Sequence, residues 1–107
     1  MPDDIKKILR ELKNGLQKIY GEQLKTVVLF GSYARGDAHP PDSDIDVMIV
    51  LRGEFDYWAM DKLCSEFVAD LSLEHDVVIS IKLASEEKYA LSKFPLYINV
   101  RREGVTV

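Results

Sequence analysis

The chain has 107 residues and a net charge of −4, so its length predicts one domain over residues 1–107. Apolar residues make up 47% and charged residues 30%, which is typical of a domain with its own core. The negative charge excludes a general nucleic-acid binder, and no apolar run is long enough to span a membrane. A single cysteine and a charged N-terminal stretch predict a cytoplasmic protein without a signal peptide.

The first half of the chain predicts one helix and two strands. Residues 3–20 carry apolar side chains at three- and four-residue steps, which is typical of an amphipathic helix, and Gly21 ends it. The β-branched run over residues 25–30 predicts a strand, and residues 32–36 are short enough for one helical turn. Residues 44–51 form the second predicted strand.

The second half predicts two more helical segments and a third strand. Residues 57–73 place apolar side chains on one helical face, and residues 76–83 read as a strand. A last helix begins near Ser85, is interrupted at Pro95 and resumes until Gly104. The order α-β-β-α-β-α predicts an α/β (α+β) domain.

The connection between the first two strands, residues 31–43, is rich in Gly and Pro. A long loop inside a small domain is usually functional. Its length is compatible with either a parallel or an antiparallel pair of strands. Candidate functional residues are therefore sought in this connection and at the strand ends that it joins.

Two carboxylates, Asp44 and Asp46, open an otherwise apolar strand. Residues i and i+2 of a strand share a face, and their Cα atoms lie about 6.6 Å apart. Two negative charges at that distance repel by roughly 2–3 kcal/mol at an effective dielectric constant of about 20. A divalent cation such as Mg²⁺ removes this penalty, because it prefers carboxylate oxygens and phosphate oxygens. The alternative is a solvated strand start whose two acids are hydrogen-bonded.

Gly31 and Ser32 follow the first strand directly. A glycine permits positive φ and lets a ligand approach the backbone, while a serine at a helical turn offers backbone N–H groups and a hydroxyl to a phosphate. The alternative for Ser32 is a helix cap. Arg35 can neutralise phosphate charge, or it can form a salt bridge with Asp37 or another acid of the loop.

The stretch "GSYARGDAHPPDSDID" resembles the signature of the polymerase β-type nucleotidyltransferase superfamily. It is most similar to the minimal nucleotidyltransferases, which are often encoded beside a HEPN-domain protein. That family places Gly-Ser before Asp-x-Asp at a similar spacing, and the connection here is one residue longer within "HPPDS". The resemblance implies a nucleotidyltransferase fold, with a small mixed sheet of about three to four strands flanked by helices.

The resemblance also implies roles for individual residues. Asp44 and Asp46 would be catalytic and would hold Mg²⁺, with two ions possible, on the triphosphate of ATP. Gly31, Ser32 and Arg35 would bind the nucleotide. The superfamily usually has a third carboxylate on the strand after the second helix. Asp76, at the start of that predicted strand, is the candidate third metal ligand, and Val78 or Ser80 would leave the site with two acids.

The function implied by the resemblance is transfer of AMP from ATP to a hydroxyl, most simply a tyrosine, of a partner HEPN toxin. The small protein would act as an antitoxin. The alternative is a catalytically weak nucleotide-binding module that neutralises its partner by forming a complex. After the predicted elements no residues remain for an acceptor domain, so we expect a partner protein to deliver the acceptor. No membrane contact and no direct nucleic-acid binding are expected.

Phosphatases and glycosyltransferases also carry Asp-x-Asp, but theirs follows the apolar run of a strand, whereas "VMIVL" here comes after the acids. Other reactive side chains are expected to be structural. His39 is interpreted as an exposed loop residue, His75 as solvated, Cys64 as a core residue and Trp58 as packed at the start of its helix.

Overall fold

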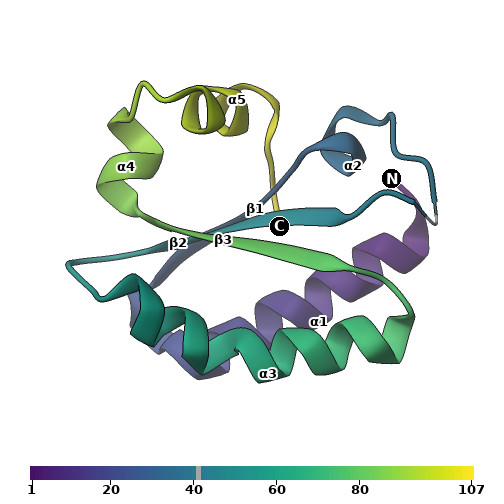
Figure 1. The fold of residues 1–107 in the computed structure, drawn as a ribbon, viewed down its shortest axis with the longest axis horizontal. Coiled ribbons are helices and arrows are strands. Elements are labelled where there is room, and N and C mark those ends of the chain that lie inside the picture. The colour runs from purple at the N-terminus through teal and green to yellow at the C-terminus, as the bar shows by residue number, and fades with distance from the viewer. Residues whose placement is uncertain (41) are drawn as a thin grey trace.

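The computed structural model describes residues 1–40 and 42–107 and places helices on both faces of one sheet (Figure 1). The helical segments are α1 (Asp3–Tyr20), η1 (Gly21–Gln23), α2 (Ser32–Arg35), α3 (Tyr57–His75), α4 (Glu86–Leu91) and α5 (Pro95–Glu103). The strands are β1 (Leu24–Phe30), β2 (Ile45–Leu51), β3 (Ile79–Ser85) and β4 (Val105–Thr106). The predicted α-β-β-α-β-α order is confirmed, and β4 follows it as a strand of two residues.

The sheet is mixed and has the strand order β3-β2-β1-β4. β1 is antiparallel to both β2 and β4, whereas β2 and β3 are parallel. The long connection after β1 therefore joins an antiparallel pair. This arrangement brings the end of β1 next to the start of β2, where Phe30 pairs with Asp46.

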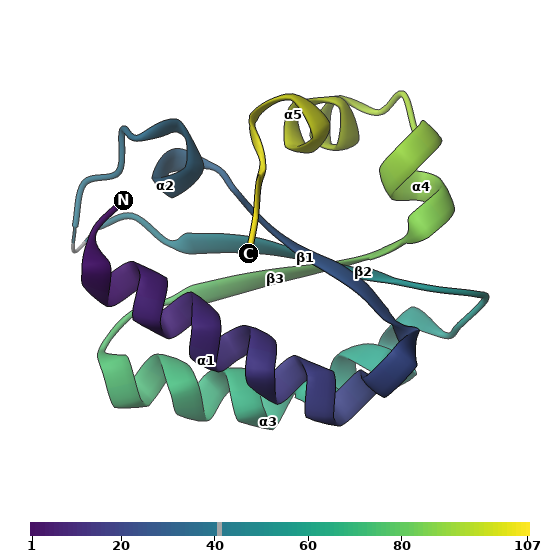
Figure 2. The same ribbon diagram turned by 180° about the vertical axis from the view of Figure 1, so that it is seen from behind.

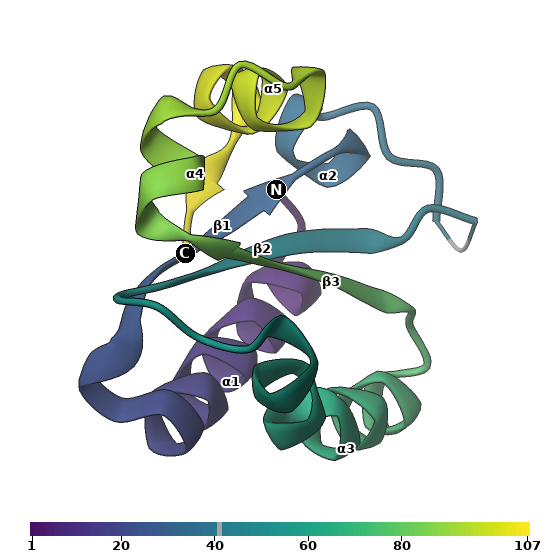
Figure 3. The ribbon, with the colours of Figure 1, turned by 60° about the vertical axis from the view of Figure 1, so that its left-hand side comes forward.

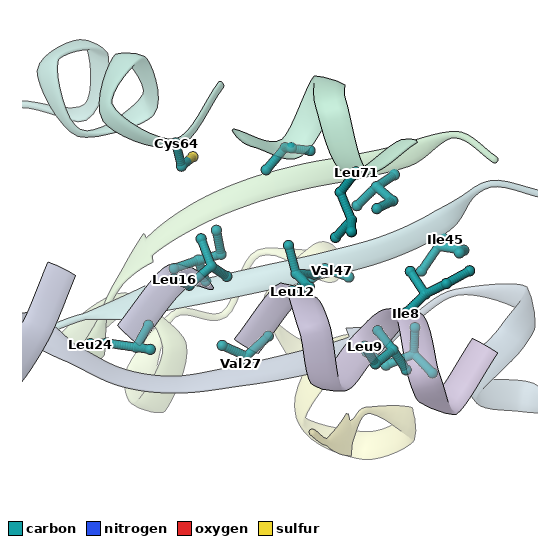
Figure 4. Packing of buried hydrophobic residues seen from close by; sticks show 14 of the residues in the cluster. Ile8, Leu9, Leu12, Leu16, Leu24, Val27, Ile45, Val47, Cys64 and Leu71 are labelled. Carbon is teal, nitrogen blue, oxygen red and sulfur yellow. The ribbon is translucent and has the colours of Figure 1, made fainter. Parts of the chain in front are cut away.

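The larger part of the core lies between the sheet and the layer formed by α1 and α3 (Figures 2 and 3). The apolar stripe predicted for residues 3–20 supplies Ile8, Leu12 and Leu16, which are at most 2% exposed. Figure 4 shows Leu12 and Leu16 near Val27 and Val47 of the two central strands. Burying each such side chain stabilises the fold by about 1.5–3 kcal/mol.

The opposite face of the sheet is covered by α4 and α5, around a smaller cluster of buried residues (Figure 1). That cluster consists of Val28, Met48, Val50, Ala84 and Val100. Because side chains alternate along a strand, Asp46 points to the same face as Met48 and Val50. Asp46 is the half-buried member of an otherwise buried β2.

The helix ends follow ordinary capping chemistry. The Asp56 carboxylate accepts hydrogen bonds from the backbone N–H groups of Trp58 and Ala59 at the start of α3. The Ser85 hydroxyl accepts from the N–H of Lys88 at the start of α4. Pro95 begins α5, where the missing proline N–H costs nothing, so the predicted interruption of the last helix is confirmed.

The third strand starts later than predicted. α3 continues to His75, and Asp76 caps its C-terminus with a left-handed backbone at φ 52°. β3 begins only at Ile79, so the predicted strand start at Asp76 is wrong. The physical reason is that an aspartate tolerates the left-handed conformation that ends a helix. Among the described residues, no helix combines the length and apolar character that a membrane crossing requires.

Candidate active site

Gly31 lies between β1 and α2 and faces the carboxylate of Asp46. Its backbone, at φ 75° and ψ −156°, occupies a region that is essentially restricted to glycine. A Cβ atom there would collide with Asp46 Oδ2 and would lie 3.2 Å from Asp46 Cγ. The prediction from sequence needed Gly31 for backbone freedom and for the approach of a ligand. The structure adds a further reason, which is the close approach of the Asp46 carboxylate from the neighbouring strand.

Ser32 begins α2, a helix of four residues that is held firmly in place. The Gly31 carbonyl accepts hydrogen bonds from the N–H groups of Ala34 and Arg35 at 3.1 and 3.0 Å. Tyr33 is 8% exposed and joins the core on the α1 and α3 side of the sheet. Ser32 is thus presented, half-buried, on a short helix whose next residue is anchored in the core.

Asp44 and Asp46 flank Ile45, the first residue of β2. Ile45 is 1% exposed and belongs to the α1 and α3 core, so its two neighbours point to the other side of the sheet. Asp44 is exposed and Asp46 is half-buried. Partial burial, and then the nearby charge of Asp44, raise the pKa of the Asp46 carboxyl, while Arg35 acts in the opposite direction. These two acids repel one another in the absence of a cation.

Arg35 is exposed and is shared between two carboxylates. Its Nε lies 3.2 Å from Asp37 Oδ2, and its Nη1 lies 3.6 Å from Glu103 Oε2 of α5. The hydrogen bond to Asp37 is the main reason that the pKa of the Arg35 guanidinium is raised. The salt bridge with Asp37 that the sequence left open is therefore present, and a second one ties α2 to α5.

These groups surround one pocket of about 310 Å³ between the strand ends and α5. Its lining residues are Phe30, Gly31, Ser32, Arg35, Asp46, Leu96, Asn99 and Glu103. Gly31, Ser32, Arg35 and Asp46 were singled out from the sequence, and Asp44 precedes the strand beside them. Leu96, Asn99 and Glu103 were missed, although their spacing of three and four residues places them on one face of a helix.

Asp76 is not brought together with the other two carboxylates. The parallel register pairs Asp46 with Ser80 and Ile45 with Ile79, and the Ile45 N–H donates to the Val78 carbonyl at 2.8 Å. Ser80 therefore occupies the strand position beside Asp46. Within residues 1–40 and 42–107 no group of three or more His, Cys, Asp or Glu side chains is arranged to hold a metal ion.

The remaining side chains considered from the sequence have structural surroundings. Cys64 is buried and His39 is exposed, as predicted. His75 was expected to be solvated, but its Nε2 lies 2.5 Å from Glu11 Oε2 and links α3 to α1. Trp58 was expected to pack, but it is 69% exposed because it lies on the outer side of α3, where the Lys62 ammonium covers its ring.

The family to which the chain belongs is established by its sequence. The sequence pattern described as "Nucleotidyltransferase domain" matches residues 9–103, which is most of the chain. The protein therefore belongs to the nucleotidyltransferase domain family, as the resemblance in residues 31–46 predicted. A nucleotidyltransferase is an enzyme that transfers a nucleotidyl group to an acceptor, so the pocket around Gly31 and Asp46 is its candidate active site.

Similar proteins agree with this assignment. MJ0604 of Methanocaldococcus jannaschii, which is named as a protein adenylyltransferase, is 38% identical over 99 residues, covering 92% of each chain. A solved structure of a toxin-antitoxin with AMP-PNP has a similar fold, with a TM-score of 0.60 and 22% identity over 90% of this chain and 69% of that one. A mutant of the MntA-HpeT toxin-antitoxin gives a TM-score of 0.58 and 20% identity over 92% of this chain and 70% of that one. These likenesses confirm the nucleotidyltransferase fold, with its mixed sheet flanked by helices.

Proposed function

We propose that the protein is a magnesium-dependent adenylyltransferase that moves AMP from ATP to a hydroxyl group of a partner protein. The observation that carries the proposal is the approach of Gly31 to the Asp46 carboxylate. It brings a backbone suited to phosphate and a carboxylate suited to a cation into one pocket. A nucleoside triphosphate with its Mg²⁺ requires both within a few ångströms.

Asp44 and Asp46 fit a magnesium site by their chemistry. Their carboxylates are hard oxygen donors, and the raised pKa of Asp46 marks the unfavourable charge that a cation would relieve. Asp44 and Asp46 would hold Mg²⁺, and a bound ion would supply positive charge to offset the negative charge of the triphosphate. Ser80 stands beside Asp46, so the proposed site has two carboxylates rather than three.

Gly31, Ser32 and Arg35 are proposed to bind the triphosphate. The backbone at Gly31 lies in the pocket beside the Asp46 carboxylate, and the Ser32 hydroxyl can donate a hydrogen bond to a phosphate oxygen. Arg35 adds a positive charge at the rim of the same pocket. To bind a phosphate, its guanidinium must exchange at least one of its contacts with Asp37 and Glu103.

The proposed reaction is an in-line displacement at the α-phosphorus. The oxygen of the acceptor hydroxyl forms a bond to that phosphorus, the bond to the bridging oxygen of the β-phosphate breaks, and pyrophosphate leaves with that electron pair. The hydroxyl proton passes to solvent. Because the protein supplies no covalent intermediate, its contribution is positioning and neutralisation of charge. The name of the 38% identical relative, a protein adenylyltransferase, supports AMP as the transferred group.

A HEPN-domain toxin is the proposed acceptor, with a tyrosine as the modified residue. This part of the proposal rests on the resemblance of residues 31–46 to minimal nucleotidyltransferases, and the toxin-antitoxin structures of similar fold are compatible with it. A toxin that binds RNA carries a basic surface, which the net charge of −4 would attract. A protruding tyrosine could enter the pocket, because the pocket opens at the surface beside exposed Asn99.

The decisive experiment combines the purified chain, ATP, Mg²⁺ and the protein encoded by the neighbouring gene. We expect mass spectrometry to find that partner heavier by one AMP, with release of pyrophosphate. The variant with Asp44→Asn and Asp46→Asn should give an unmodified partner. An unmodified partner in the wild-type reaction, with AMP transferred instead to a small molecule such as an aminoglycoside, would contradict the proposal.

One observation favours a second candidate function, a nucleotide-binding module that silences its partner by forming a complex. Ser80 rather than an acid lies beside Asp46, and a site with two carboxylates holds a second ion less well. The distinguishing result is inhibition of the partner at a stoichiometric ratio without any change in its mass. If inhibition also survives in the double aspartate variant, transfer of AMP is not the means of silencing.

A further inference from the structure

The face that α5 turns toward the pocket changes in polarity along its length. Leu96, Asn99 and Glu103 line the pocket from this helix. Glu103 lies at the phosphate end, because its carboxylate is paired with Arg35, which comes from the helix that Ser32 begins. At a rise of about 1.5 Å per residue, Asn99 lies about 6 Å and Leu96 about 10 Å further along the helix axis.

The pocket therefore has a charged end and a less polar end. Asp46, Arg35 and Glu103 mark the charged end. Leu96, half-buried on α5, and the exposed amide of Asn99 mark the other end. A nucleotide has the same order of groups, with charged phosphates followed by a ribose and an aromatic base. This correspondence orients the nucleotide, with its base against α5.

We propose that Asn99 is the residue that selects adenine, and this inference rests on the proposed use of ATP. The carboxamide of asparagine offers one acceptor and two donors. Its oxygen accepts a hydrogen bond from the adenine N6 amino group while its NH₂ donates to N7, the bidentate pairing by which asparagine recognises adenine in nucleic acids. Leu96 contributes apolar contact to the face of the base.

The same amide disfavours guanine. Guanine presents two acceptors on that edge, O6 and N7. When the Asn99 NH₂ group donates to one of them, the Asn99 oxygen faces the other, and two acceptors cannot form a hydrogen bond. Cytosine and uracil have no N7. The bidentate pairing is worth roughly 5- to 150-fold in discrimination between bases, which sets the size of the effect to be measured.

The test compares the affinities of Mg-ATP and Mg-GTP, measured by titration calorimetry, for the wild type and three variants. We expect the wild type to prefer ATP by roughly 5- to 150-fold, and Asn99→Ala to lose that preference by weakening ATP alone. Leu96→Ala should weaken both nucleotides to a similar extent. Asn14→Ala is the matched control, because Asn14 is exposed on α1, outside the residues that line the pocket.

Each outcome has a distinct meaning. Equal wild-type affinity for ATP and GTP, or a ratio that survives in Asn99→Ala, overturns the inference and leaves the proposed adenylyltransferase activity standing. Failure of the wild type to bind Mg-ATP overturns both. Thermal melting of each variant separates loss of recognition from loss of fold, and the exposure of Asn99 makes a folded variant the expected result.

Discussion

Ser80 of β3 lies directly beside Asp46 of β2 in the parallel ladder, on the face of the sheet that α5 covers. Because paired residues of neighbouring strands point to the same side, the side chains of Ser80 and Asp46 are neighbours on that face of the sheet. A hydroxyl at this position adds no charge to the pair formed by Asp44 and Asp46. The number of carboxylates at the site is therefore set by one residue of β3.

Replacing Ser80 by aspartate should convert the pair of carboxylates into a triad. We expect Ser80→Asp to lower the melting temperature of the metal-free protein, because a third negative charge joins two others, and to raise its affinity for Mg²⁺. Ser65→Asp, on an exposed part of α3, is the control for added charge. Thermal melting with and without Mg²⁺ measures both effects. An identical response of the two variants would mean that Ser80 does not face the acids.

Asp76→Asn tests the third ligand expected from the sequence. Asparagine readily adopts the left-handed conformation found at this helix end, so the variant should keep the fold. We expect unchanged nucleotide binding and unchanged transfer, because Asp76 belongs to the cap of α3 rather than to β3. A large loss of AMP transfer at unchanged nucleotide affinity would show that Asp76 acts at the metal site after all.

The raised pKa of Asp46 makes a prediction about stability and pH. A carboxyl whose pKa is higher in the folded state lowers stability above that pKa, and the penalty disappears as the pH falls toward the ordinary value of 3.8. Asp46→Asn should therefore melt higher than the wild type at about pH 7, and the difference should shrink toward about pH 4. Asp70→Asn, exposed on α3, is the control. A lower melting temperature for Asp46→Asn at neutral pH would show that the carboxylate is structural.

Gly31→Ala should be much more damaging than Gly36→Ala, although both glycines have positive φ. A Cβ at Gly36 meets nothing within 4 Å, so that variant reports the backbone strain alone, about 1–2 kcal/mol. At Gly31 the same atom also collides with the Asp46 carboxylate. Unfolding in denaturant measures both losses. If the collision is real, Gly31→Ala should cost less in an Asp46→Ala background, and equal costs in the two backgrounds would contradict it.

Ser32→Ala should weaken binding of Mg-ATP and leave the melting temperature nearly unchanged. Loss of a hydrogen bond to a charged group costs about 1.5–3 kcal/mol, or roughly 10- to 150-fold in affinity. The fold is spared because the carbonyl of Gly31, rather than the hydroxyl of Ser32, receives the first hydrogen bonds of α2. Ser65→Ala provides the control for removal of a hydroxyl from a helix. Wild-type affinity in Ser32→Ala would move the phosphates away from this residue.

The parts of the structure that follow from local pattern were predictable from the sequence. The apolar stripe over residues 3–20 predicted the bounds of α1, because the buried residues of this helix recur on one face. The apolar run of β2 likewise predicted which of its residues are buried in the core. The resemblance to nucleotidyltransferases placed Gly31, Ser32 and Asp46 in one site, and the antiparallel pairing of β1 with β2 brings the two ends of their connection together.

The wall of the pocket formed by α5 could not be predicted in this way. Leu96, Asn99 and Glu103 are more than forty residues away from Asp46 in the chain, and only the packing of α5 over the sheet brings them to it. The sequence of α5 also does not indicate which face of this helix packs against the strands. The prediction that the third strand starts at Asp76 was wrong for a related reason. Whether this residue ends the helix or begins the strand depends on its own left-handed conformation.

The two sides of the sheet are held by cores of different size, and the wall of the pocket belongs to the smaller one. α5 contributes Val100 to that smaller cluster and is followed by the short strand β4, which pairs with Val28 and Leu29, while the Val107 N–H donates to the Val27 carbonyl. Opening of α5 should therefore cost less free energy than opening of the sheet beneath it. Amide hydrogens of α5 would exchange with solvent before those of β1 and β2, and a nucleotide that touches both α5 and Asp46 would slow the exchange of this helix in particular.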